Sequence, residues 1–315
     1  MNRLVVRRSL AALVLPLALA AGCCLALAGG ASAQAPSFKT FPSAAAAADA
    51  FVDAVRHDDR NALLAMLGSD WTVFVPTLKD DTDHHRERFL AAWDESHKIV
   101  QQSEDKAMVE VGTTGFTMPM PIVKVPDGWR FDVAAGTREI KARHIGHNEL
   151  VVVQTMLAIV DAQHEYAMLD PMKTGLHAYA ARIMSRSGKK DGLYWPAKPG
   201  EPRSPLGSLL AKAEVAPSGE SKPQAFYGYH FRMLHGQGPS APGGAYDYDA
   251  RGALIGGFAA IAWPRQYGET GVMTFMVSFS GEVYEKDLGP RTDELARAIT
   301  VFDPESGWQK SDLTP

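Results

Sequence analysis

Several histidines of this sequence are paired closely enough to bind a metal ion. They occur as His84-His85, His144-x-x-His147 and His230-x4-His235. Two histidines at positions i and i+3 of a helix can bind one metal ion. The sequence has no H-E-x-x-H motif and no third residue at a spacing typical of a metal ligand. Gly146 is also expected to break the helix beside His147. We therefore predict solvated or hydrogen-bonded histidines, with no metal site and no cofactor.

Catalytic and phosphate-binding motifs give no signal either. The sequence holds no G-x-S-x-G, no G-x-G-x-x-G and no G-x-x-x-x-G-K-[ST]. The two cysteines, Cys23 and Cys24, both lie in an apolar N-terminal segment. A serine nucleophile would therefore need a base from a distant loop. The sequence names no catalytic residue.

Two loop blocks, residues 191–196 and 243–248, combine Gly, Asp, Tyr and Trp. Such residues supply tight turns and rigid amphipathic contact area, and aromatic rings stack well on sugars. A structural reading is also open, in which Asp-Gly forms a turn and the aromatic rings fill the core. The candidate binding residues are Asp191, Tyr194, Trp195, Tyr246, Asp247 and Tyr248.

The charge of the chain excludes one large class of partner. Its 315 residues contain 32 basic and 36 acidic side chains, and three of the arginines lie within residues 1–33. Nucleic-acid binding needs concentrated positive charge, which the remaining chain lacks. We predict no nucleic-acid partner.

Residues 1–33 are typical of a secretory signal peptide. Arg3, Arg7 and Arg8 precede an apolar stretch over residues 10–28, and Ala31-Ser32-Ala33 supplies the small residues of a cleavage site. We predict cleavage after this site, a periplasmic or secreted protein, and no membrane span in the mature chain. The alternatives are a retained transmembrane anchor, twin-arginine export, and lipidation of Cys23 within Ala-Ala-Gly-Cys.

Helices are expected first in the mature chain, over residues 44–55, 62–67 and 86–98, with Ser43 and Asp58-Asp59 as caps. Strands follow over residues 107–111, 116–125 and 129–133, with a hairpin turn at residues 126–128. This order resembles the cone-shaped α+β fold of nuclear transport factor 2-like (NTF2-like) domains over residues 41–134. That fold can leave a pocket, which we expect to be filled by Trp71, Phe74, Phe89, Trp93 and Phe116.

A second α+β domain is expected over residues 135–310. A short helix over residues 137–143 precedes a longer one from residue 148, whose centre is apolar on almost every side and therefore buried. Helix is also expected over residues 209–215, and strands over residues 226–234, 254–263, 273–279 and 283–284. A long helix on an antiparallel sheet is similar to the head domain of type IV pilin-like proteins.

Five segments within this part of the chain form a recognisable set. They are D-A-Q-H-E-Y-A from Asp161, G-K-K-D-G-L-Y-W-P from Gly188, Y-G-Y from Tyr227, A-P-G-G-A-Y-D-Y from Ala241 and Y-G-E-T-G-V-M-T-F from Tyr267. In this order they resemble the bacterial envelope family called domain of unknown function 2950 (DUF2950), over residues 41–308. The resemblance implies no activity and no catalytic residue. The loop at residues 170–175 departs from the acidic, Gly-rich loop that is frequent in the family.

Two functions fit these observations. We expect an exported envelope protein that binds a partner protein or a cell-wall component without catalysis. The alternative is a periplasmic hydrolase or small-ligand-binding enzyme that uses the cleft between the two domains. An enzyme needs a cluster of titratable groups in a concavity, whereas a binding protein needs an apolar or aromatic contact surface.

Overall fold

The protein is represented by a computed structural model that describes residues 38–74, 82–197, 200–201, 203–207, 224–305 and 307–313. The expected signal peptide and the expected helix at residues 209–215 lie outside the described residues. The described chain mixes helices with antiparallel sheets, so the α+β prediction is confirmed.

The N-terminal helices begin where the sequence places their caps. Helix α1 (Ala44–Arg56) starts at Ser43, whose hydroxyl accepts a hydrogen bond of 3.1 Å from the Ala46 amide. Helix α2 (Arg60–Leu67) starts at Asp59, whose carboxylate accepts one of 3.0 Å from the Ala62 amide. Each cap supplies an acceptor for an amide that the first helical turn leaves unpaired. A 3₁₀ turn (Gly68–Asp70) and helices α3 (Trp71–Phe74) and α4 (Thr82–Glu95) follow.

The first sheet contains two elements that the sequence did not predict correctly. Strand β1 (His97–Ser103) was not predicted. The helix expected over residues 86–98 was drawn too long, since α4 ends at Glu95. The strand expected over residues 116–125 divides into β3 (Phe116–Thr117) and β4 (Ile122–Val125), since the prolines at 119 and 121 have no amide hydrogen for a ladder. The sheet order is β1-β2-β4-β5, with β3 beside β2 (Lys106–Val111) and the predicted hairpin joining β4 to β5 (Gly128–Phe131).

A hydrophobic core, here called the N-terminal core, forms where α1, α2 and α4 pack on this sheet. Its largest fully buried side chains come from the second helix and from the sheet segments. They are Leu63, Met66, Leu67, Met120, Ile122 and Phe131.

One long helix, α5 (Val133–Leu169), replaces the two helices that the sequence predicted. It begins at Asp132, whose carboxylate accepts a hydrogen bond from the Ala135 amide. The predicted break at Gly146 is wrong, because one exposed glycine inside a helix costs only about 1 kcal/mol. That cost is small beside the burial of the apolar residues that follow.

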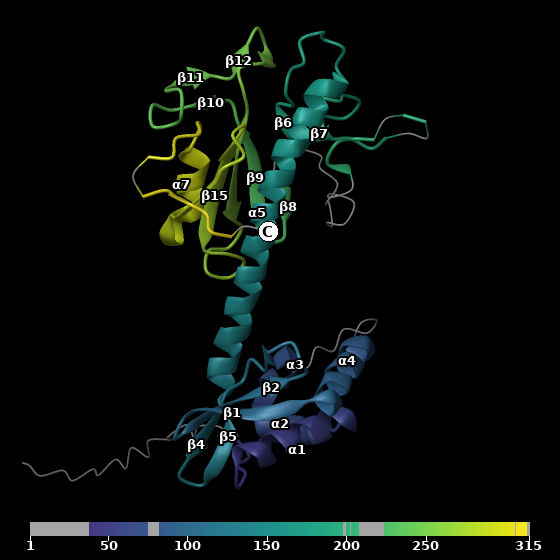
Figure 1. Cartoon of the computed structure of the whole chain (residues 1–315), viewed down its shortest axis with the longest axis vertical. Coiled ribbons are helices and arrows are strands. Elements are labelled where there is room, and N and C mark those ends of the chain that lie inside the picture. The colour runs from purple at the N-terminus through teal and green to yellow at the C-terminus, as the bar shows by residue number, and fades with distance from the viewer. Residues whose placement is uncertain are drawn as a thin grey trace, which may run out of the picture. The chain divides into compact units, whose positions relative to one another are not determined.

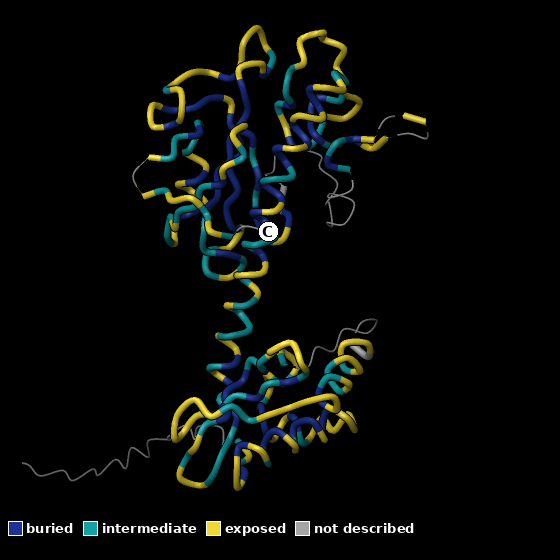
Figure 2. The backbone as a smooth tube through the Cα atoms, viewed as in Figure 1, coloured by how far each residue is buried: buried dark blue, intermediate teal, exposed yellow. Residues whose placement is uncertain are grey.

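The second half of α5 packs on a six-stranded antiparallel sheet (Figure 1). The expected strand over residues 226–234 is instead a hairpin, because Tyr227 and Gly228 both have positive φ and turn the chain between β8 and β9. Buried residues follow the strands of this sheet (Figure 2). The sheet order is β17 (Gln309–Lys310), β16 (Val283–Asp287), β15 (Met273–Ser278), β14 (Ala259–Pro264), β9 (Tyr229–Leu234) and β8 (Gln224–Phe226).

Both faces of this sheet are covered, which explains why every residue of β14 is buried. Ala260 and Ala262 face the cluster that includes α5, and Ile261 and Trp263 face a second cluster on the α7 (Thr292–Ala298) side. Short elements complete the fold: β6 (Arg182–Met184) parallel to β7 (Gly192–Tyr194), β10 (Gly236–Gln237) with β11 (Tyr246–Asp247), β12 (Asp249–Ala250) with β13 (Ala253–Leu254), and a 3₁₀ turn (Gly289–Arg291). Among the described residues, no helix has the length and apolar character needed to cross a bilayer.

Candidate functional site

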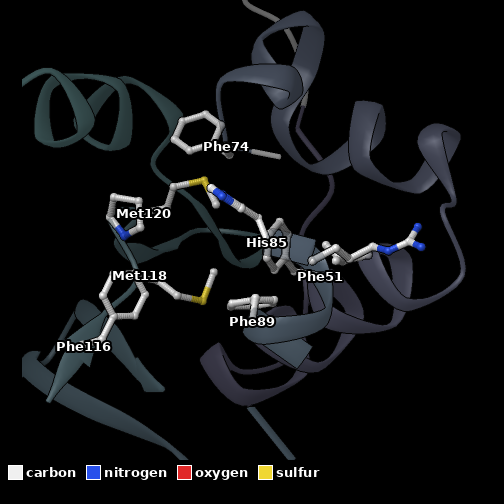
Figure 3. A pocket seen from close by; sticks show the side chains of 10 residues that line it. Phe51, Phe74, His85, Phe89, Phe116, Met118 and Met120 are labelled. Carbon is white, nitrogen blue, oxygen red and sulfur yellow. The ribbon is translucent and has the colours of Figure 1, made fainter. Parts of the chain in front are cut away.

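The N-terminal core contains a cavity of about 280 Å³ that is open to solvent on one side (Figure 3). The expectation that aromatic side chains fill this space is therefore wrong: Phe74, Phe89 and Phe116 form walls around it. Trp93 is instead buried against His97, with ring centroids 3.9 Å apart. The described residues that line it are Phe51, Val55, Phe74, His85, Arg86, Phe89, Phe116, Met118, Pro119 and Met120.

Ordinary helix and extended-chain periodicities bring these side chains together. Phe51 and Val55 are four residues apart on α1, and His85 and Phe89 are four residues apart on α4, so each pair shares one helix face. The opposite wall comes from alternate residues of the segment that runs from β3 toward β4. In Figure 3 the labelled Phe and Met side chains face a common space, with His85 among them.

Glycine at position 136 shapes the wall formed by Phe74 and Met120. A Cβ atom at Gly136 would lie 2.6 Å from Met120 Cγ and 2.8 Å from Phe74 Cε1. Both distances are far below van der Waals contact, so helix α5 can approach these side chains only because residue 136 has none. Gly136 precedes the helix expected from residue 137, and no signal in the sequence indicated this close approach.

The cavity opens to solvent near Phe116 and His85, since both line it and both are exposed. Phe116 keeps 48% of its surface exposed although it is a large apolar residue. The Arg143 guanidinium lies 5.7 Å from the centre of the Phe116 ring. Arg143 is itself held in place, because it donates to the Thr117 carbonyl and to the Glu139 carboxylate, both at 2.8 Å.

The described walls of this cavity are largely apolar. Among the described residues of the lining, the titratable side chains are His85 and Arg86, and none of these residues carries a carboxylate, a hydroxyl or a thiol. An acid–base or nucleophilic mechanism needs at least two such groups in reach of one substrate atom. In the described ranges, no group of three His, Cys, Asp or Glu residues is placed to hold a metal ion.

Three of the predicted binding residues, Asp191, Tyr194 and Trp195, lie at β7 and its ends. The Asp191 carboxylate accepts hydrogen bonds from the Arg186 amide at 2.9 Å and from its Nε at 2.6 Å. Burial raises the pKa of Asp191, but the bonds and charge of Arg186 outweigh it and leave the pKa below its ordinary value. Tyr194 is half-buried, and Trp195 is only 4% exposed.

The ring of Trp195 belongs to the core on the α5 face of the sheet. Its centroid lies 6.3 Å from that of Tyr166, and the Lys190 ammonium lies 5.6 Å from it. The Tyr166 hydroxyl donates a 2.6 Å hydrogen bond to the Lys190 carbonyl, and burial raises the pKa of Tyr166 to about 12. These contacts give Trp195 a packing role, while a role in binding stays a prediction.

The other three predicted residues lie at β11. Tyr246 and Asp247 are exposed, whereas Tyr248 is fully buried. The Tyr248 hydroxyl donates to Gln237 Oε1 at 2.9 Å, and Gln237 Nε2 donates to the carbonyls of Pro242 and Gly244. Within the described chain, no hydrogen bond, ion pair or ring contact joins this group to the residues at β7. The structure therefore does not bring the six residues into one site.

The Y-G-Y and Y-G-E-T-G segments close a loop on helix α5. Glu149 Oε1 accepts hydrogen bonds from the Val272 amide at 2.8 Å and from the Met273 amide at 3.0 Å. The Tyr229 hydroxyl also lies 3.3 Å from this oxygen, and a Cβ at Gly271 would overlap that hydroxyl. Burial, followed by the charge of Glu149, raises the pKa of Tyr229 above its ordinary value. The two segments have a structural role here.

Comparison with known proteins gives one match. The family model described as protein of unknown function (DUF2950) matches residues 38–311. No curated protein and no solved structure gives a significant match. The matched range spans the cavity, the long helix and the six-stranded sheet, and nearly the whole described chain, so the protein belongs to the DUF2950 family.

Proposed function

We propose that this protein is a non-catalytic binding protein of the cell envelope, and that its cavity holds an apolar group of a partner protein or of a cell-wall component. The observation that carries the proposal is a cavity of about 280 Å³ with a Phe- and Met-rich lining. Ligand pockets are typically apolar with few polar groups, and binding there is driven by burial of apolar surface.

The envelope location is supported by the sequence of residues 1–33, which has the basic start, apolar stretch and small-residue cleavage site of an exported protein. The expected likeness of residues 41–134 to NTF2-like domains is consistent with a pocket, since helices packed across a curved sheet can leave one in that fold. The likeness of the C-terminal part to pilin heads is a further proposal, supported by the long helix on an antiparallel sheet.

Binding of an environment-sensitive apolar dye, N-phenylnaphthylamine, tests the proposal. The mature chain from Gln34 should enhance its fluorescence saturably. Val55→Phe adds a ring at the wall of the cavity and should weaken dye binding at least tenfold. The matched control is Leu64→Phe, which adds the same ring at an exposed position of α2 outside the lining.

Thermal melts of both variants check that each remains folded, because overpacking costs about 1–3 kcal/mol. Equal dye binding by the wild type and the folded Val55→Phe variant would contradict the assignment of the cavity as the binding site.

A further inference from the structure

We infer that the cavity receives a single linear acyl or alkyl chain whose polar end stays outside. This inference rests on the proposed function and specifies the chemistry of the ligand. It is drawn from the size of the cavity, the chemistry of its walls and the position of its opening.

The size of the cavity exceeds what one ring needs. An apolar cavity of ~150 Å³ accommodates a molecule of the size of benzene. The present cavity is about 280 Å³, so a single aromatic side chain of a partner would leave much of it empty. Lining atoms that face unfilled volume lose their dispersion contacts, so a ligand long enough to fill the cavity binds more strongly.

The walls exclude a polar ligand. Carbon and sulfur atoms of Phe51, Phe74, Phe89 and the two methionines dominate the lining, and no wall residue in the described part of the chain carries a hydroxyl or a carboxylate. A sugar ring or a peptide backbone would lose its hydrogen bonds to water on entry and regain few of them. Only the hydrocarbon part of a ligand can be buried here at low cost.

The methionines favour a flexible chain over a rigid fused ring. Met118 and Met120 contribute unbranched thioether side chains, which adjust their rotamers to irregular ligands. The exposed rim at Phe116 and His85 leaves one end of the cavity open. A chain can therefore enter with its apolar end first, and its head group stays in water.

This geometry has a quantitative consequence. Each methylene transferred from water into an apolar site strengthens binding about fourfold. The gain should continue with chain length until the cavity is full and then stop, because further methylenes remain in solvent. A plateau within a homologous series is the signature of a cavity of fixed length.

The test is isothermal titration of the mature chain with saturated fatty acids from hexanoate to hexadecanoate, each below its micelle concentration. A parallel series of lysophosphatidylcholines separates free fatty acids from phospholipids as the source of the chain. We expect affinity to rise about fourfold per methylene and then to level off. Binding of both series would show recognition of the chain alone, and binding of only one would identify the source.

A pair of glycine variants tests whether the acyl chain binds in this cavity. Gly136→Ala should displace Met120 and Phe74 and so change the shape of the cavity, because both side chains would lie within 2.8 Å of the new Cβ and both line the cavity. The plateau should then come at a shorter chain length, with at least fivefold weaker binding of the longest ligands. Gly146→Ala lies in the same helix, has no atom within 4 Å of its new Cβ, and should bind as the wild type does.

The outcomes separate this inference from the proposed function. If the protein binds N-phenylnaphthylamine but shows no dependence on chain length, the acyl-chain inference is wrong and the binding function stands. If neither the dye nor any chain binds, both are wrong. If Gly136→Ala fails to fold, Val55→Phe serves as the second variant, and an unchanged plateau in that variant would overturn the inference.

Discussion

Gln163 offers a direct test of how helix α5 holds the segment that follows it. The side chain is fully buried and pairs with both backbone groups of Ala180: Nε2 donates to the carbonyl at 2.9 Å and Oε1 accepts from the amide at 2.8 Å. Ala180 is also fully buried. Gln163 therefore acts as a strand would, by supplying a donor and an acceptor to an extended segment.

The change Gln163→Leu removes both hydrogen bonds and keeps most of the side-chain volume. It leaves the amide and the carbonyl of Ala180 buried without partners, and each orphaned group costs about 1–3 kcal/mol. The greater hydrophobicity of leucine offsets part of this loss. We expect the free energy of unfolding to fall by about 2–5 kcal/mol.

Urea unfolding followed by circular dichroism measures this change. The midpoint should fall while the denaturant slope stays constant, since a change of slope would indicate a changed denatured state or loss of two-state behaviour. The matched control is Gln309→Leu at an exposed position of β17, which should alter stability by no more than about 0.5 kcal/mol. A loss below about 1 kcal/mol for Gln163→Leu would contradict this prediction, because it would mean that the backbone groups of Ala180 find other hydrogen-bond partners.

Three further predictions concern the predicted binding residues and the export signal. Trp195→Ala should lower the free energy of unfolding by about 3–5 kcal/mol, since it empties a buried site; an unshifted urea midpoint together with lost partner capture would instead make Trp195 a recognition residue. Because the pKa of Asp191 is lowered in the folded protein, its pairing with Arg186 stabilises the fold at pH values above the ordinary carboxyl pKa. This stabilisation is lost as the pH falls through the lowered pKa. The acid-unfolding profile of Asp191→Asn should therefore be flatter than that of the wild type. Intact mass of the exported protein should correspond to a chain that begins at Gln34, and a diacylglycerol-modified Cys23 would overturn the predicted cleavage.

Local signals in the sequence predicted the beginnings of the first two helices and the hairpin between β4 and β5 correctly. Ser43 and Asp59 cap the first two helices, and residues 126–127 turn the chain between β4 and β5. Each of these features depends on a few neighbouring residues, because caps and turns are formed by contacts three or four positions apart. The family could be identified from sequence for a similar reason, since its five segments can be read in order without knowledge of their contacts.

Elements governed by competing signals were predicted less well. Gly146 suggested a helix end, but α5 continues through it because packing on the six-stranded sheet outweighs a local cost. Tyr227 fits the alternation of side chains that predicted one strand over residues 226–234. It nevertheless takes a positive φ and turns the chain between β8 and β9. A pattern of period two does not reveal where a strand folds back on itself when the turn residue is aromatic.

The α+β class, the caps of the first two helices, the lack of recognisable catalytic motifs and the family could all be read from the amino-acid sequence. The cavity in the N-terminal core and the role of Gly136 in its wall could be seen only in the folded protein. The physical reason is that a void depends on how side chains from α1, α3, α4 and the segment after β3 pack together across long sequence separations. Composition and periodicity report which residues are apolar, but the space they leave between them exists only once the elements are placed against one another.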